Sequence, residues 1–239
     1  MFSWFRRNKK VGLLPYISEE VNNKNTNSPQ FQGWEINTFD IPSCWKKTKG
    51  DGVTVAVLDT GCALKHTDLK DNLLEGKNFI DPSEPPVDRV GHGSHVAGTI
   101  AASDNRMGMV GVAPMTKIIP VKVLGDQGFG GMESISNGIV WAADQGVDFI
   151  TMSLGSSFSD PRMKNAVDYA DKIGCKNIHL LAGKTDLSSR SLVTLIENLK
   201  YARDLCEPKD IGVLVEPKNR RDIPNYFIST IEQACEIIE

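Results

Sequence analysis

An aspartate and a histidine stand at positions where this sequence could carry out acyl transfer. Asp59 follows the apolar, β-branched run of residues 53–58, and His92 lies in the motif GHGSH of residues 91–95. An aspartate can orient an imidazole that then acts as general base, which supplies two of the three groups of a nucleophilic triad. Asp59 alone has other interpretations, because aspartic proteases carry the same Asp-Thr-Gly tripeptide and a loop aspartate can cap a helix. The glycines on both sides of His92 favour the catalytic interpretation, since they allow close backbone approach.

The elements around these two residues alternate between strands and helices. Apolar runs predict buried strands over residues 53–58, 118–124 and 147–154, and small or amphipathic segments predict helices over 93–102 and 134–145. The alternation continues with helices over 163–173 and 191–206, strands over 178–182 and 211–215, and a last helix that Ser229 opens, with Glu232 completing a capping box. Such units with short joints predict a parallel sheet, so the fold class is α/β. Residues 1–45 are polar and are expected to be irregular.

Composition places the chain among ordinary globular proteins. It has 239 residues, 40% of them hydrophobic and 24% charged, and its formal net charge of −3 excludes the simplest electrostatic case for nucleic-acid binding. No apolar run reaches the ~18–20 residues of a membrane-spanning helix, and no apolar segment follows the basic start, so neither a membrane partner nor a secretory signal is expected. Five scattered cysteines without CxxC spacing argue against a disulfide framework and a zinc site. A cytoplasmic enzyme is therefore expected.

Five motifs, in their order along the chain, resemble the subtilase family of serine proteases. They are VAVLDTGC (55–62), GHGSHVAGTIAA (91–102), GVAP (111–114), VKVLG (121–125) and ITMSLG (150–155). The resemblance covers roughly residues 50–170 and implies peptide-bond hydrolysis, with Asp59 as the orienting acid and His92 as the general base. It also implies two edges that pair with an extended peptide or protein substrate, formed by Gly128, Phe129 and Gly130 on one side and by Ser153, Leu154 and Gly155 on the other.

Two further expectations come with this resemblance. The segment Leu13-Leu14-Pro15-Tyr16 is similar to the N-terminal extension of intracellular subtilisins, which lies across the active site and keeps the zymogen inactive. Residues 1–45 are therefore expected to form such an extension, with a disordered basic tail as the alternative. Asp68 and Asn105 match side-chain positions of the family's structural calcium site, so calcium is the implied cofactor.

The sequence departs from the subtilase pattern at the nucleophile and at the oxyanion hole. The family's nucleophile motif Gly-Thr-Ser-Met-Ala does not occur in it, and Lys184 stands where the family has the oxyanion-hole asparagine. A long lysine stem is less preorganised than a short amide. Because the Asp–His pair then has no nucleophile to activate, we expect no turnover at ordinary protease rates.

The last third of the chain resembles a different family. GCKNIHLLAG (174–183), ENLKYA (197–202) and VLVEPKNRRDIPNYF (213–227) are similar to hydroxypyruvate isomerases, metal-dependent sugar isomerases of the xylose isomerase-like TIM-barrel type. The resemblance places Glu216 at a metal-binding, catalytic position at the C-terminal end of a strand. A merely charged strand end is the preferred interpretation, because one carboxylate cannot supply the oxygen cage of such a metal.

The sequence therefore predicts a chimera: an N-terminal extension over residues 1–45, a partial subtilase domain over 46–170 and a partial isomerase-like segment over 171–239. Its fold is expected to be a subtilisin-like parallel sheet with flanking helices, continued by βα units of TIM-barrel type. Three functions stay open. They are a serine endopeptidase by family that is inactive as the chain stands, a sugar isomerase fragment, and a non-catalytic module that binds extended peptide around Asp59, His92 and Ser153.

Overall fold

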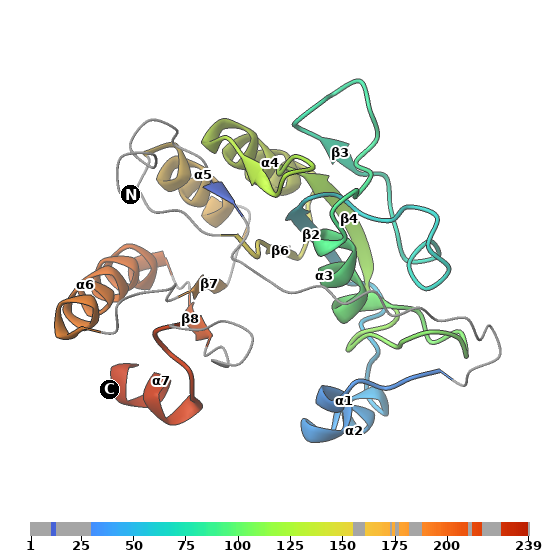
Figure 1. The fold of residues 1–239 in the computed structure, drawn as a ribbon, viewed down its shortest axis with the longest axis horizontal. Coiled ribbons are helices and arrows are strands. Elements are labelled where there is room, and N and C mark those ends of the chain that lie inside the picture. Colours follow the sequence, from blue (N-terminus) through green and yellow to red (C-terminus); the bar gives the residue numbers. More distant parts are fainter. Residues whose placement is uncertain are drawn as a thin grey trace. The chain divides into compact units, whose positions relative to one another are not determined.

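The computed structural model describes residues 11–12, 30–154, 161–172, 174, 177–181, 188–209, 212–216 and 226–238. The chain divides into two compact units, one formed by Met1–Gly12 and Glu20–Tyr169 and the other by Leu13–Glu19 and Ala170–Glu239 (Figure 1). Leu13-Leu14-Pro15-Tyr16, Gly155 and Lys184, which carry expectations from the sequence, lie outside the described residues.

A four-stranded parallel sheet forms the centre of the first unit, with the strand order β3-β4-β2-β6. Strand β2 spans Thr54–Asp59, β3 spans Lys77–Asn78, β4 spans Lys117–Lys122 and β6 spans Phe149–Thr151. Strand β2 has a neighbour on each side, and its residues after Thr54 are all buried. A run of β-branched and apolar residues suits such a central strand, which therefore delivers Asp59 to the carboxyl edge of the sheet.

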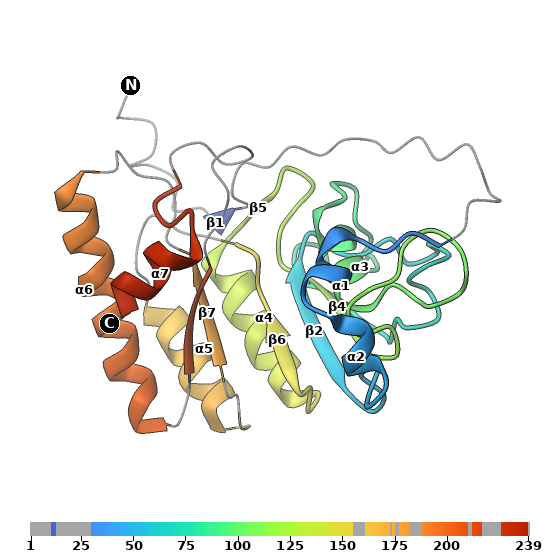
Figure 2. The same ribbon diagram turned by 90° about the horizontal axis from the view of Figure 1, so that it is seen from below.

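Helices cover both faces of this sheet (Figures 1 and 2). Helix α3, His92–Ala101, shares a hydrophobic cluster with β2 through Ala97, Ala101 and Val57. Helix α4, Met132–Asp144, lies on the other face, where a Cβ added to Gly138 would stand 3.5 Å from Cδ2 of Leu58. Successive strand residues such as Val57 and Leu58 point to opposite faces, so each helix meets its own set of β2 side chains. The expected parallel sheet with flanking helices is confirmed.

The short elements are the ones that the sequence does not predict. Helices α1, Trp34–Thr38, and α2, Ile41–Trp45, lie within residues expected to be irregular, and they pack against each other (Figure 2). Five residues are too few to show a helical period of apolar positions, so the sequence does not predict these two helices. Strand β6 covers three residues instead of the eight predicted over 147–154. Strand β5, Phe129–Gly130, pairs antiparallel with β1, Val11–Gly12.

The part of the second unit that the structure describes contains two parallel strands and two α-helices that lie wholly within it. Strand β7, Asn177–Leu181, pairs in parallel with β8, Gly212–Glu216. Helix α6, Ser189–Cys206, and the 3₁₀ turn η1, Glu207–Lys209, connect them, and helix α7, Ile231–Ile238, follows. Helix α5, Pro161–Lys172, precedes this pair and contains the division between the units, since its residues up to Tyr169 belong to the first. Phe227, Ile228 and Ala234 form the buried core of the unit. Among the described residues, no helix is long and apolar enough to cross a membrane.

Candidate active site

Asp59 and His92 form a hydrogen-bonded pair at the carboxyl edge of the sheet. Asp59 is the last residue of β2, its side chain is 0% exposed, and the backbone N–H of Thr60 donates to its Oδ1 at 2.7 Å. Nδ1 of His92 lies 2.8 Å from Oδ1 and 2.9 Å from Oδ2 of that carboxylate. With Nδ1 held by the carboxylate, Nε2 is the ring nitrogen that would take a proton from a nucleophile. The His92 side chain is 18% exposed, so the ring reaches solvent while the acid does not.

Two glycines allow the backbone to pack closely around the end of β2. A Cβ on Gly93 would lie 2.2 Å from the carbonyl oxygen of Gly61 and 3.1 Å from Cβ of Asp59. Gly61 itself has a φ of +106°, and a Cβ there would stand 2.5 Å from the carbonyl oxygen of Pro86. A larger residue at Gly93 would push the start of α3 away from the end of β2, and one at Gly61 would push away the segment that holds Pro86, Val87 and Asp88. Of the two glycines that flank His92, Gly93 therefore has the close approach that the sequence predicts. A Cβ on Gly91 would meet nothing within 4 Å, and glycine suits that position because of its φ of +97°.

Asp88 supports both members of the pair, and sequence reasoning missed it. Its carboxylate accepts hydrogen bonds from the hydroxyls of Thr60 and Ser94, at 2.8 and 2.6 Å, and from the backbone N–H groups of Val90, Gly91 and Ser94. Burial raises the pKa of Asp88, but these hydrogen bonds, led by that of Ser94, outweigh it and hold the pKa below its usual value. An aspartate four residues before the histidine, at a helix start, is the signal that could have found it.

The first predicted substrate edge is a strand in the structure. Gly128 precedes β5, and a Cβ on Gly130 would lie 2.2 Å from the carbonyl oxygen of Val123, so only glycine fits there. A pocket of about 410 Å³ lies beside this edge and is lined by Phe129, Gly130 and Asp126 among others. On the other predicted edge, Ser153 and Leu154 follow β6 and are half-buried.

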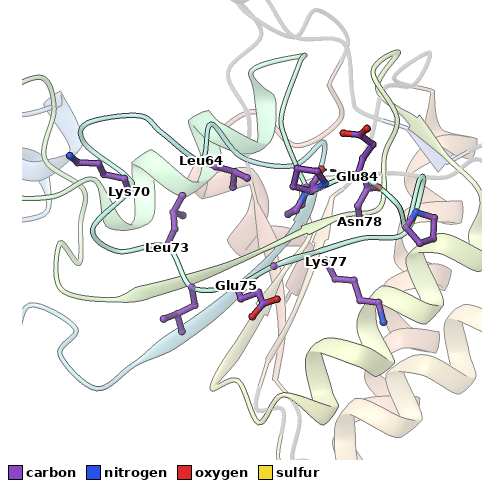
Figure 3. A pocket seen from close by; sticks show the side chains of 12 residues that line it. Leu64, Lys70, Leu73, Glu75, Lys77, Asn78 and Glu84 are labelled. Carbon is purple, nitrogen blue, oxygen red and sulfur yellow. Dashed lines mark hydrogen bonds between the residues drawn. The ribbon is translucent and has the colours of Figure 1, made fainter.

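A second pocket, of about 440 Å³, lies along β3 at the outer edge of the sheet (Figure 3). Its apolar lining comes from three leucines and three prolines, which are Leu64, Leu73, Leu74, Pro82, Pro85 and Pro86. Neither Asp59 nor His92 lines this pocket, so it is separate from the candidate active site.

The predicted calcium ligands are neighbours in the structure. Nδ2 of Asn105 donates to Oδ1 of Asp68 at 3.2 Å, and the backbone N–H of Met109 donates to Oδ2 at 3.0 Å. Gln30, which sequence reasoning did not select, joins the same loop, because its Nε2 donates to the carbonyl oxygens of Ser103 and Met109 at 2.7 and 3.1 Å. One carboxylate, two amides and two loop carbonyls are ligand types that fit a hard cation. No local sequence pattern identifies Gln30, because the residues around it are polar and show no strand or helix period.

The remaining candidate, Glu216, is the last residue of β8, and its backbone pairs with Leu181 of β7. Its predicted place at the C-terminal end of a strand is therefore correct. Within the parts of the chain that the structure describes, no three His, Cys, Asp or Glu residues gather as a metal site. The metal-binding role of Glu216 stays a prediction.

Comparison with known proteins finds two families. The model of the subtilase family matches residues 50–194, and that of the xylose isomerase-like TIM barrel matches residues 159–239. Both resemblances inferred from the motifs are thus confirmed at family level.

Curated relatives point to the first of these families. The major intracellular serine protease of Bacillus subtilis is 43% identical over 173 residues, which are 70% of this chain and 53% of that protein. An intracellular serine protease of Paenibacillus polymyxa is 42% identical over 68% of this chain and 50% of its own length, and thermitase of Thermoactinomyces vulgaris is 37% identical over 60% and 53%. The chain therefore spans about half the length of these relatives. With the Asp59–His92 geometry and a family match over more than half of its residues, the chain belongs to the subtilase family.

Proposed function

We propose that this 239-residue chain carries the Asp–His half of a subtilase active site and binds an extended peptide along β5 without hydrolysing it. The contact of His92 Nδ1 with both oxygens of a fully buried Asp59 is the observation that supports the site most strongly. The edge at β5 and the pocket beside it support peptide binding, since backbone pairing gives affinity and a pocket gives side-chain preference.

The parental reaction assigns a role to each residue of the pair. Asp59 holds the imidazole in the tautomer that has its proton on Nδ1, and it stabilises the imidazolium that forms when Nε2 takes a proton. In subtilases that proton comes from the nucleophilic serine, whose motif this sequence lacks. The pair therefore has a base without its partner, and the 239-residue chain is proposed to be inactive as a protease.

Peptide binding is tested by altering one glycine of the edge. Gly130→Ala drives a Cβ into the Val123 carbonyl and should weaken binding of an uncleaved extended peptide by about tenfold or more, because the strand must shift. Gly98→Ala is the control, since a Cβ at Gly98 meets nothing within 4 Å and Gly98 lies in α3, outside the lining of the pocket beside β5. Isothermal titration calorimetry with the peptide measures the affinity of both variants. Equal affinities for the two would refute binding along β5.

The N-terminal segment is proposed to be inhibitory because it occupies this same edge. Val11 pairs with Gly130 and Gly12 with Phe129, in the antiparallel direction that an extended peptide would use. A tethered strand competes at a high effective concentration. Deleting residues 1–12 should therefore increase peptide affinity by about tenfold or more, and an unchanged affinity would exclude this role.

Calcium is proposed to bind at the loop of Asp68, Asn105 and Gln30. When bound there, the ion would neutralise Asp68 and fix the loop by binding oxygens of one carboxylate, the amides and backbone carbonyls. Calcium should raise the melting temperature of the chain, and Asp68→Asn should abolish that shift. Asp104→Asn is the control, because Asp104 lies on the same loop but pairs with Lys49 at 2.8 Å. An identical calcium shift in both variants would contradict the proposal.

A cytoplasmic location is proposed, because two of the relatives are named intracellular proteases.

A second candidate function, a hydroxypyruvate isomerase-like fragment, is supported by the position of Glu216 at a strand end and by the family match over residues 159–239. It predicts a metal-dependent interconversion of a small hydroxy-aldehyde that Glu216→Gln abolishes. Absence of that activity with Mg²⁺ or Mn²⁺ would remove it.

A further inference from the structure

A buried lysine lies directly beside the catalytic acid. Lys122 is the last residue of β4 and stands in register opposite Asp59 of β2. The residue is 4% exposed, and it belongs neither to the Asp–His pair nor to the substrate edge. Burying an ammonium group is costly unless the charge is paired and its N–H groups are hydrogen-bonded. The position therefore calls for a specific set of partners.

The partners of Lys122 belong to two different parts of the site. Its Nζ donates to the backbone carbonyl of Thr60 at 2.6 Å and to Oδ1 of Asp126 at 2.8 Å. Oδ2 of Asp126 in turn accepts from Nη1 of Arg89 at 3.2 Å. These two cations, first Lys122 and then Arg89, hold the pKa of Asp126 below its ordinary value through their hydrogen bonds. Asp126 thus remains an anion and joins the two cations.

Each partner leads to one component of the candidate active site. Thr60 follows the catalytic acid and its hydroxyl accepts the N–H of Gly93 at 3.0 Å, one residue after His92. Arg89 lies three residues before that histidine. Asp126 lies in the turn before β5, which closes through hydrogen bonds from Gly125 to Phe129 and from Gly128 to Gly125, at 2.8 and 2.9 Å. Strand end, histidine loop and substrate edge therefore meet at one ion cluster.

We propose that Lys122 is a positioning residue which, with Asp126, holds the substrate edge in a fixed relation to the Asp59–His92 pair. When the turn at Asp126 moves, the Lys122 ammonium group moves with it, because the two are hydrogen-bonded. The same ammonium group is bonded to the Thr60 carbonyl, so the displacement reaches the residue after Asp59. Peptide binding at β5 therefore changes the environment of the His92 imidazole. This proposal rests on the proposed peptide binding. Lys122 does not line the pocket beside β5, and its hydrogen bonds are to Thr60 and Asp126 and not to the imidazole, whereas Asp126 also lines that pocket.

The test measures the His92 ring and peptide affinity in the same samples. Lys122→Met keeps the apolar stem and removes the charge, and Asp126→Asn keeps the shape of a side chain that is 44% exposed. The matched control is Lys117→Met, because Lys117 lies at the start of the same strand and its Nζ also donates to a backbone carbonyl, that of Asp71 at 2.8 Å. Nitrogen-15 NMR of the imidazole and titration with an uncleaved extended peptide are the two readouts.

We expect Lys122→Met and Asp126→Asn to shift the His92 ring resonances, to abolish their response to the peptide and to weaken binding by about three- to tenfold. Lys117→Met should leave all three unchanged. Unaltered His92 resonances together with unaltered affinity in Asp126→Asn would overturn the proposal, as would equal effects in Lys117→Met. Should Lys122→Met not fold, Asp126→Asn decides by the same criteria. Failure of the unmodified chain to bind peptide, also after deletion of residues 1–12, would instead refute the proposed function.

Discussion

At the scale of single residues, some members of the site can be predicted from the sequence, whereas others are recognised only in the folded structure. Asp59 and His92 are predictable because strand ends and glycine-flanked histidines leave a local pattern. Lys122 leaves none, because the Thr60 carbonyl that it binds lies 62 residues away, and Asp88 leaves only its place four residues before His92. Their importance arises only when β2, β4 and the start of α3 meet. Supporting residues of a site are therefore the ones that sequence reasoning misses.

Cys62 gives a prediction at this scale. It is 1% exposed, and its pKa is raised from 9.0 to about 12, first by burial and then by the charge of Asp88, with a smaller opposing effect of the Ala63 N–H. At pH 8 only about one thiol in 10⁴ is then ionised. Iodoacetamide labelling with peptide mapping should modify the exposed Cys44 and Cys235 and spare Cys62 until the chain unfolds.

The same thiol affects stability at high pH. The folded state holds the proton more tightly than the unfolded state, so the contribution is complete below about pH 9 and is lost as pH rises toward about 12. Cys62→Ala should reduce the loss of melting temperature over this range. Rapid labelling of native Cys62 at pH 8 would contradict both expectations.

At the scale of elements, long patterned segments were predictable and short ones were not. The runs that became β2, β4, α4 and α6 each show a strand or helix period over six or more residues. Elements of two to five residues, such as α1, α2, β3 and β5, depend on tertiary contacts for their existence. The β5 edge could be located only through the family resemblance.

The start of α7 was predicted one residue too early. The hydroxyl of Thr230 accepts the N–H of Gln233 at 3.1 Å, and Oε1 of Gln233 accepts the N–H of Ser229 at 2.9 Å. Thr230 is therefore the cap, and Gln233 instead of Glu232 is the residue whose side chain reaches back, to the N–H of Ser229 just before the cap. Ser-Thr and Glu-Gln stand next to each other, so the capping pattern fits in two registers.

This register makes a prediction for helix stability. Thr230→Ala should lower the free energy of unfolding by about 1 kcal/mol, because it removes the cap. Glu232→Ala is the control and should cost much less, since Glu232 is exposed and the cap does not use it. Urea denaturation of the second unit, followed by circular dichroism, measures both. A larger loss for Glu232→Ala would restore the register first predicted.

At the scale of the whole molecule, two compact units and two family matches describe one chain. The two family models overlap over residues 159–194, and the units divide at Tyr169. Average composition did not indicate this division, because the chain as a whole has the residue usage of an ordinary globular protein. The origin of the chain as a chimera stays a prediction, and a sequencing read that crosses codons 165–185 in one frame would support it.

Separate cores predict separate unfolding. The three tryptophans within the described residues, Trp34, Trp45 and Trp141, belong to the first unit, whereas α6 and α7 belong to the second. The second unit is small, and small units bury too little surface to be very stable. Circular dichroism should therefore report an early transition that tryptophan fluorescence does not. Coincident transitions by both probes would show that the chain unfolds as one cooperative body.

The most direct test of the proposed function is mass spectrometry of the purified chain incubated with an extended peptide and a serine-directed covalent probe. Because the Asp59–His92 pair lacks a nucleophile motif, we predict a bound, uncut peptide and no probe adduct. Gly130→Ala should remove the bound peptide, and Gly98→Ala should retain it. Cleavage of the peptide together with stoichiometric labelling of a serine would contradict the account.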